Sequence, residues 1–500
     1  MDDLAAARAE LAHLEERARK LAKELLAVRA AVSVQRAKLD ELIRTRTPAI
    51  HRLPAELLLP ILSIEIHHYR DSRRKQELAG VSCRWRDIIL HSPSLWSTIN
   101  VTWLNRSLIK MHLRRSREAP LNVVIDGGSP RWMPAPKLTA LLDIVMSCAY
   151  RWHTLEAIDF GNTGGHYPDG FMVFIFDKFK HLELPCLNRL RICTAEGIHP
   201  SFSLLHTPSL QHLDLGKFTT LSGSSAIPVL QSLRLASHGG LERPLLPNRI
   251  STQKLTTLAL FGDVSQWPLE PDSIQLPVLR SFTVEVLGAK EFMEAIVAPN
   301  LEYFKYSSSD PHSDAFGQVG SKFSKVRHIS ISFPDSTPLR CSDYHDYGGA
   351  MALSVAFPGI RHAELNGKNI ALFFSISSLP CAGRPAERWT GLETLTILGA
   401  SGILPSGFTD LIDWLVHRRR CGFSPLRIKL IYTGHNSEGV TFNPNILRYY
   451  YKLREHCILE MEGFQLISIM NICLGENSPM MLVSAYVSIT PHRTYSFLRT

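Results

Sequence analysis

A short apolar pattern, L-x-x-L-x-L with aliphatic or aromatic replacements, recurs along most of the chain and constrains its fold more than any other feature. It occurs in the segments TLEAIDF (154–160), CLNRLRI (186–192), SLQHLDL (209–215), VLQSLRL (229–235), KLTTLAL (254–260), VLRSFTV (278–284), NLEYFKY (300–306), KVRHISI (325–331), GIRHAEL (359–365) and GLETLTI (391–397). Between Leu187 and Val326 successive repeats begin 20–25 residues apart, and steps of 32–34 residues flank this region. A period of this length is typical of architectures that stack one small unit per repeat.

The L-x-L end of each repeat predicts a short strand, because its apolar residues alternate with a period of two. Stacking such strands in parallel would join their apolar faces into one core. Proline often stands just before the repeat, where it can begin a strand without interrupting a ladder. These prolines are Pro185, Pro208, Pro228, Pro277, Pro299 and Pro358.

The first 46 residues show a different period. Two sets of mostly apolar residues recur every seven positions, and together we call them the seam. The first set is Leu4, Leu11, Ala18, Leu25, Val32 and Leu39, and the second, three residues on, is Ala7, Leu14, Leu21, Val28, Gln35 and Leu42. This a/d heptad, with no glycine or proline before Pro48, predicts a long helix. Charges beside the seam would attract in the pairs Asp3/Arg8 and Glu24/Arg29 and repel in Glu10/Glu15. Two arrangements remain open: a homodimeric coiled coil through residues 4–42, or a single amphipathic helix lying on the rest of the protein.

Residues 50–103 predict a small helical unit. In IHRLPAELLLPIL (50–62), Pro54 suits the first position of a helix. Leu57, Ile61 and Ile64 would share one face of this helix, and Leu58, Leu62 and Ile66 another, so both faces need cover. Pro60 is expected to kink or interrupt it. A second helix would carry Leu78, Val81, Trp85 and Ile88, end at Ser92-Pro93 and lead to a strand in TINVTW (98–103).

The segments LPAELLLPIL, VSCRWRDI and SPSLWSTI, taken in this order, resemble the F-box. Members of that family dock on a Skp-type adaptor through the F-box helices. The resemblance implies that the contacts with the adaptor come from Leu53, Pro54, Leu57, Ile61, Leu62, Val81, Cys83 and Trp85. Packing within the F-box itself is the alternative role for each of them, and Cys83 is expected to be a small buried side chain rather than a reactive thiol. Leu95 and Trp96 would connect the unit to the repeats.

The repeats resemble leucine-rich repeats, although the Asn or Cys usual after the second leucine pair is absent. Those places hold Ala195, Phe218, His238, Asp263 and Leu287, so we expect a degenerate, irregular solenoid. An F-box followed by such repeats is similar to F-box–leucine-rich-repeat proteins, including the large fungal families. These are substrate receptors of SCF-type cullin-RING ubiquitin ligases, in which the adaptor leads to a cullin and the repeats bind a protein target. A scaffold whose F-box acts outside a ligase is the alternative.

The middle residue of each L-x-L strand must point away from the core, so these residues would line up along one concave face. They are Asp159, Arg191, Asp214, Arg234, Ala259, Thr283, Lys305, Ser330, Glu364 and Thr396. We take Arg191, Asp214, Arg234 and Lys305 as candidate target-binding residues. Since arginine suits bidentate contact with carboxylate or phosphate, the target would be acidic or phosphorylated. Solubilising surface charge is an equally compatible interpretation.

The expected fold class is therefore α/β, with four parts. Residues 1–47 form a long helix, 48–103 the F-box and 104–463 a leucine-rich-repeat solenoid with a parallel sheet. Within the last of these, 446–463 should form a helix and then a strand. Residues 464–500 show no repeat and are left unassigned.

Composition and motifs exclude several function classes. The formal net charge of +9 is spread over 500 residues, and the run Arg418-Arg419-Arg420 is expected to be solvated surface, so no nucleic-acid partner is predicted. Nine cysteines without a C-x-x-C indicate a reducing compartment and no metal site. The start MDDLAAARAE is unlike a signal peptide, and no apolar run reaches the roughly 18 residues that span a bilayer, so we expect a cytoplasmic or nuclear protein without a membrane partner. No nucleophile elbow, P-loop or dinucleotide fingerprint occurs, which predicts a non-enzyme with no catalytic residues and no cofactor.

Overall fold

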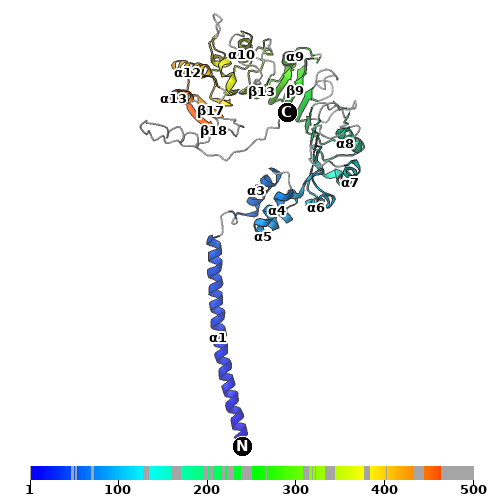
Figure 1. Ribbon diagram of the computed structural model, residues 1–500, viewed down its shortest axis with the longest axis vertical. Coiled ribbons are helices and arrows are strands. Elements are labelled where there is room, and N and C mark those ends of the chain that lie inside the picture. The colour runs from blue at the N-terminus through cyan, green and yellow to red at the C-terminus, as the bar shows by residue number, and fades with distance from the viewer. Residues whose placement is uncertain are drawn as a thin grey trace. The chain divides into compact units, whose positions relative to one another are not determined.

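The computed structural model contains helices and strands in two compact units, residues 1–210 with 219–223 and residues 211–218 with 224–500 (Figure 1). It describes residues 2–46, 50, 53–68, 72–127, 134–159, 170–194, 201–202, 207–216, 220–221, 230–237, 251–265, 267, 269–307, 315–317, 319–320, 322–332, 344–376, 383–400, 403–431 and 444–462. The unassigned C-terminal segment 464–500 lies outside these residues, as do Ala195, Phe218 and His238.

The first unit begins with helices only. Helix α1 (Asp2–Arg46) is unbroken, as the heptad predicts. Three shorter helices follow: α3 (Ala55–His68), α4 (Ser72–Val81) and α5 (Cys83–His91), with a 3₁₀ turn at Pro93–Trp96. Helix α3 runs continuously through Pro60, so the expected interruption does not occur.

A parallel sheet with its strands in chain order completes the first unit. Its strands are β1 (Thr98–Asn100), β2 (Leu121–Asp126), β3 (Trp152–Ile158) and β4 (Arg189–Cys193). Helices α6 (Arg106–Ser116), α7 (Ala135–Met146) and α8 (Phe171–Phe179) lie in the connections, with a 3₁₀ turn at Ala149–Arg151. The short strands β5 (Ser201–Phe202) and β7 (Thr220–Leu221) form a separate pair.

The second unit holds a larger parallel sheet, again in chain order. Its strands are β6 (His212–Leu215), β8 (Ser232–Ser237), β9 (Thr257–Asp263), β11 (Ser281–Leu287), β13 (Tyr303–Ser307), β14 (His328–Ser332), β15 (His362–Asn366), β16 (Thr394–Leu398), β17 (Arg427–Ile431) and β18 (Ile458–Glu462). The strands β10 (Ile274–Gln275) and β12 (Ile296–Val297) pair apart from it. The helices are α9 (Ala289–Ala295), α10 (Tyr344–Ala356), α11 (Ile370–Phe374), α12 (Pro405–Arg420) and α13 (Pro444–His456), with 3₁₀ turns at Gly367–Asn369 and Pro385–Arg388. The predicted helix and strand at 446–463 are therefore present.

The strands bury alternate side chains, which confirms the sheet predicted from the repeats. In β11, for example, Phe282 and Val284 are fully buried, whereas Thr283 between them is only half-buried. Phe282 lies in register with Leu258 of β9 and Phe304 of β13, so the apolar side chains of neighbouring strands line up on one side of the sheet. Phe304 also stacks on Phe357 with ring centroids 4.7 Å apart.

The register corrects one member of the predicted outward row. Leu155 pairs with Leu190 and Ala157 with Ile192, so the residue opposite Arg191 is Glu156 and not Asp159. Asp159 follows β3 and is buried. The segment TLEAIDF contains two overlapping apolar alternations, and the sequence pattern selected the wrong one.

Arg418 corrects the expectation that the arginine run 418–420 is solvated surface. Its side chain is buried, and burial lowers the pKa of its guanidinium. It donates to the backbone carbonyl oxygens of Trp389 (3.4 Å), Thr390 (3.5 Å) and Leu392 (2.7 Å), in the turn that leads into β16. Arg420, two residues on, is exposed.

Replacing Arg418 with methionine should lower the free energy of unfolding by about 3 kcal/mol, because buried carbonyl groups lose their donors. Arg420→Met removes the same charge from an exposed position of the same helix and should change stability by less than about 0.5 kcal/mol. Urea unfolding of the two variants checks this. Equal effects would show that the backbone contacts of Arg418 add nothing to stability.

Candidate partner-binding surfaces

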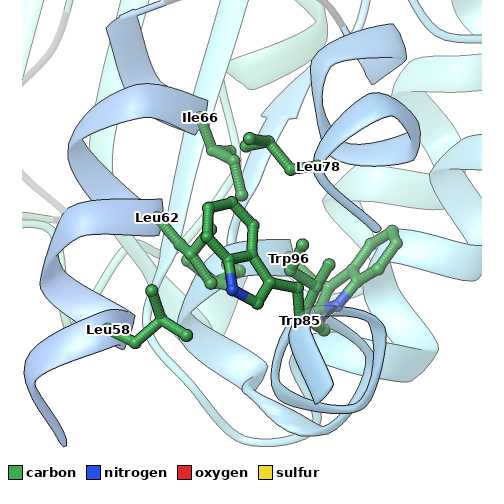
Figure 2. Close-up of a cluster of buried hydrophobic side chains, with 8 residues drawn as sticks. Leu58, Leu62, Ile66, Leu78, Trp85 and Trp96 are labelled. Carbon is green, nitrogen blue, oxygen red and sulfur yellow. Dashed lines mark hydrogen bonds between the residues drawn. The ribbon is translucent and has the colours of Figure 1, made fainter. Parts of the chain in front are cut away.

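Helices α3, α4 and α5 close around a small apolar core (Figure 2). Because Leu58, Leu62 and Ile66 recur every four residues, they lie on one face of α3 and point into this core. The full cluster is Leu58, Leu62, Ile66, Leu78, Trp85, Ile89, Leu95 and Trp96. One face of the two-faced α3 is thus covered within the unit.

Trp96 connects the helical unit to α6, in agreement with the linking role predicted for it. Its indole Nε1 donates to the Ile89 carbonyl oxygen at 2.7 Å. The Lys75 ammonium lies 5.0 Å from the ring centroid and the Arg115 guanidinium 4.4 Å. The His112 ring meets the indole edge-on at 5.1 Å. Both Arg115 and His112 belong to α6, so a cation–π and ring cluster holds this helix against Trp96.

Burial lowers the pKa of two groups in this cluster. Desolvation lowers the pKa of Lys75 to about 8. For His112, burial and then the nearby charge of Lys75 lower the pKa to about 4. The imidazole is therefore neutral at physiological pH, which limits the repulsion among the basic groups around Trp96.

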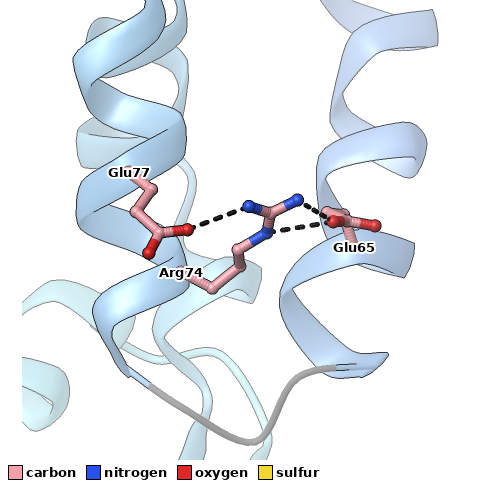
Figure 3. Close-up of polar contacts among 3 residues, drawn as sticks. All are labelled: Glu65, Arg74 and Glu77. Atoms are coloured by element: carbon pink, nitrogen blue, oxygen red, sulfur yellow. Dashed lines mark hydrogen bonds and ion pairs between the residues drawn. The ribbon is translucent and has the colours of Figure 1, made fainter.

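Arg74 links α3 to α4 by an ion-pair bridge (Figure 3). Its Nη1 donates to Glu77 Oε2 at 2.9 Å, and its Nε donates to Glu65 Oε1 at 2.9 Å. Hydrogen bonds to Glu77 and Glu65 raise the pKa of Arg74. Because these groups are partly exposed, the bridge fixes the angle between the helices more than it adds stability.

Residues of the segments LPAELLLPIL and VSCRWRDI form hydrogen bonds that fix the starts of α3 and α5. Pro54 immediately precedes the helix, one position earlier than predicted, and its carbonyl oxygen accepts from the Leu58 amide at 3.0 Å. The Leu53 carbonyl oxygen accepts from Arg84 of α5. At the start of α5, Ser82 Oγ caps the helix by accepting from the Trp85 amide at 3.2 Å.

A second apolar face of α3 stays exposed. Leu57, Ile61 and Ile64 are 56%, 44% and 71% exposed, and Val81 at the end of α4 is 53% exposed. Since 57, 61 and 64 fall one helical turn apart, they form a continuous strip. We call Leu57, Ile61 and Ile64 the apolar face.

The predicted adaptor contacts divide between this surface and the core. Pro54, Leu57, Ile61, Val81 and Cys83 are exposed, and Leu53 is half-buried. Leu62 and Trp85 are only 1% and 8% exposed and pack in the core, which is the alternative role that the sequence left open for them. The expectation that Cys83 is buried is also wrong, because its side chain is exposed. Ile64 is not among the predicted contacts, although its helical spacing already places it beside Leu57 and Ile61.

In each unit the outward row of the strands forms a further candidate surface, and ion pairs between neighbouring strands lie on it. Arg191 contacts Glu156 of the neighbouring strand at 3.4 Å. In the second unit Arg234 Nε lies 3.6 Å from Asp214 Oδ1, and its guanidinium lies 4.3 Å from the Phe261 ring. Lys305 sits between Thr283 and Ser330 in the register. Of the four predicted target-binding residues, the structure brings Asp214 and Arg234 together.

A strip of rings runs beside this row and was not predicted from the sequence. Tyr303, His328 and His362 occupy matching positions on three adjacent strands. The Tyr303 and His328 ring centroids are 5.7 Å apart, and those of His328 and His362 are 4.7 Å apart. Burial lowers the pKa of His328, and next to the strip Ser330 Oγ donates to Glu364 Oε1 at 2.8 Å. Each ring stands two positions before a residue of the outward row, so the same spacing applied to the sequence would have located these rings.

Two further findings bear on the class of partner. Within the described residues, no group of three or more His, Cys, Asp or Glu side chains is placed to bind a metal ion. None of the helices in the same part of the chain combines the length and hydrophobicity of a membrane span.

Comparison of the chain with models of protein families and with the sequences of curated proteins found no match.

The buried Lys75 predicts a pH-dependent stability. Its pKa falls from 10.5 in the unfolded chain to about 8 in the folded one, so between these values the unfolded chain binds more protons and stability rises with pH. Below pH 8 both states are protonated and the penalty is constant. Lys75→Met should therefore raise the free energy of unfolding at neutral pH by about 1–3 kcal/mol, and the gain should vanish as the pH approaches 10.5.

Urea unfolding of the full chain from neutral pH upwards measures this difference. Lys110→Met, at an exposed position of α6, is the matched control and should show no such trend. A Lys75→Met chain less stable than the wild type at neutral pH would show that the contact with Trp96 outweighs the burial penalty.

Proposed function

We propose that this chain is the substrate receptor of an SCF-type cullin-RING ubiquitin ligase. In this role residues 48–103 are an F-box that binds a Skp-type adaptor, and residues 104–463 are a degenerate leucine-rich-repeat solenoid that binds the protein target. The observation that carries the proposal is the apolar face, which is exposed on a helical unit whose other side is well packed.

The apolar face has the properties of a protein-binding surface. Leu57, Ile61 and Ile64 form an exposed aliphatic strip on a unit whose core buries Leu58, Leu62, Trp85 and Trp96. Contiguous exposed apolar patches of this kind mark interaction sites. Covering a side chain such as Leu57 or Ile61 contributes about 1–2 kcal/mol, so this surface favours a partner with an apolar groove.

The F-box motif and the apolar face coincide. Leu53, Pro54 and Arg84 hold the start of α3, and this places Leu57 and Ile61 outward. The motif tryptophans, by contrast, hold the core and the contact to α6. The same short sequence thus supplies both the framework and the exposed residues that a docking module needs.

The repeat interpretation is supported by the strand order. Apart from the separate pairs β5/β7 and β10/β12, the strands within each unit lie parallel and in chain order, and the apolar positions of L-x-x-L-x-L point to one side. This is the expected arrangement of stacked repeats of 20–25 residues. We assign the target to the outward side of the strands, which carries Arg191 in the first unit and Asp214, Arg234, Lys305 and the ring strip in the second. We assign the protein to cytoplasm or nucleus. The role requires neither a catalytic residue nor a cofactor in this chain.

Adaptor binding should depend on the apolar face. Replacing Leu57 and Ile61 with aspartate would place two carboxylates in the apolar contact and should weaken adaptor binding by at least 100-fold, on the order of 3 kcal/mol. The measurement is co-purification of the full chain with a co-expressed Skp-type adaptor. Ile376→Asp, at an equally exposed aliphatic residue of the second unit, is the control and should bind normally.

Undiminished binding of the Leu57→Asp/Ile61→Asp chain would exclude this surface as the adaptor site. Leu53→Ala with Pro54→Ala tests the same interface indirectly, because these residues hold the beginning of α3. Recovery of a cullin together with the adaptor separates the ligase from the alternative, a non-catalytic scaffold whose F-box acts outside a ligase. A scaffold would retain the adaptor without the cullin.

The paired charges give a test of the predicted acidic or phosphorylated target. The double variant Asp214→Asn/Arg234→Gln removes one cross-strand pair while leaving the net charge unchanged. Arg191→Gln with Glu156→Gln does the same in the first unit. If the target's acidic groups bind these arginines, both variants should reduce labelling of proteasome-stabilised neighbours in a proximity-labelling experiment, by about ten-fold for one lost bidentate contact.

Unchanged labelling would show that the pairs serve only the sheet. The Leu57→Asp/Ile61→Asp chain is the reference in the same experiment. It should label the same neighbours, and proteasome inhibition should no longer increase their amount.

A further inference from the structure

We infer that α1 is one strand of a parallel, in-register, two-stranded coiled coil whose other strand is a second copy of this chain. The inference does not depend on what the F-box-like unit or the sheets bind. It is based on the seam of α1, on the period of that seam and on the residues that flank it.

The seam residues of α1 are exposed along the whole helix. The nine leucine and valine side chains at the a and d positions are between 45% and 63% exposed. They are Leu4, Leu11, Leu14, Leu21, Leu25, Val28, Val32, Leu39 and Leu42. A helix with so many regularly spaced apolar side chains gains its main stability by covering them.

The period of the seam indicates what kind of partner buries it. A helix that packs on a globular body needs a wide apolar stripe with a period of 3.6 residues, whereas this seam keeps a strict period of 3.5 over six heptads. A straight helix would carry such a seam around its axis by about 20° per heptad. Only a partner helix that supercoils with α1 can follow it, and the chain itself supplies an identical one.

The polar seam position Gln35 selects the parallel orientation. In a parallel, in-register pair each seam residue meets its own counterpart, so Gln35 meets Gln35 and the two amides can hydrogen-bond to each other. In an antiparallel pair that uses the whole seam, residue 4 faces residue 42 and Gln35 faces Leu11. That arrangement buries each amide against a leucine without a partner, at a cost of about 1–3 kcal/mol per amide.

The flanking charges agree with this orientation. In the parallel pair Asp3 meets Arg8 of the second copy, and Glu24 meets Arg29, each contact occurring twice by symmetry. The pair Glu10/Glu15 is the repulsive exception.

A parallel dimer has a consequence for the rest of the molecule. Helix α3 begins at Ala55, shortly after α1 ends at Arg46, so both copies of the helical unit follow from the same end of the coiled coil. Two apolar faces and two sets of strands would then act together. A target with two binding segments would be held with an avidity above that of one copy.

Light scattering of the full chain at micromolar concentration tests the dimer. We expect twice the single-chain mass of 56.2 kDa. Leu14→Gln with Leu21→Gln should raise the dissociation constant by at least about 1000-fold and give the single-chain mass, because four leucines leave the interface. Leu26→Gln with Val34→Gln is the matched control: these side chains are 63% and 55% exposed but lie off the seam, so the dimer should persist.

A wild-type chain of single-chain mass, or a Leu14→Gln/Leu21→Gln chain that stays dimeric, would overturn the inference. Circular dichroism of this variant should retain the strand signal, which separates loss of the dimer from loss of the fold.

The Glu10→Lys variant tests the orientation. In the parallel dimer it turns two repulsive contacts with Glu15 into attractive ones and should tighten the dimer roughly 5- to 30-fold at low salt. In an antiparallel pair residue 10 would lie near Ala31 or Lys38 instead, so the dimer would be unchanged or weaker. Either of these last two results would overturn the parallel orientation.

Discussion

The apolar side of each short strand is buried together with that of its neighbours under side chains from the connecting segments, and this requirement organises most of the molecule. In β11 the residues Phe282 and Val284 are fully buried, and their register partners on β9 and β13 are buried as well. Because most of the strands follow the same alternation, the side chains between the buried ones form rows on the opposite side. The ring strip and the ion pairs between neighbouring strands are consequences of this register, since residues at equal positions come within reach of one another.

The small helical unit follows a different rule. Helix α3 has two apolar faces, but α4 and α5 supply cover for only one of them. The covered face is also held by polar links, through Arg74 to α4 and through Arg84 to the carbonyl of Leu53. The helix therefore keeps its angle without covering Leu57, Ile61 and Ile64. A face that stays apolar and exposed on a fixed helix is suited to bind a preformed groove.

The sequence predicted the parts of the fold that depend on period. The helix α1, the parallel strands and their inward residues all follow from spacings of 3.5 and 2. The sequence did not predict the structure correctly where two apolar patterns overlap, or where a side chain binds backbone groups from a distant part of the chain. In TLEAIDF the choice between Glu156 and Asp159 is made only by the pairing with Arg191. Arg418 looks like surface charge in a run of arginines, but the carbonyl groups that it binds come from residues some 26–29 positions earlier in the chain.

At the candidate sites, too, residue spacing predicted some features and not others. Helical spacing placed Leu57 and Ile61 on one face, but it could not tell which face α4 and α5 would cover, so it did not show that Leu62 lies in the core of the unit. On the strands, spacing identified the outward row but not the pairing of its charges. Once Arg191 faces Glu156 and Arg234 faces Asp214, an acidic target must compete with carboxylates that are already in place. The charges of these two pairs largely cancel at a distance, so long-range attraction is weak and binding there must depend on close contacts.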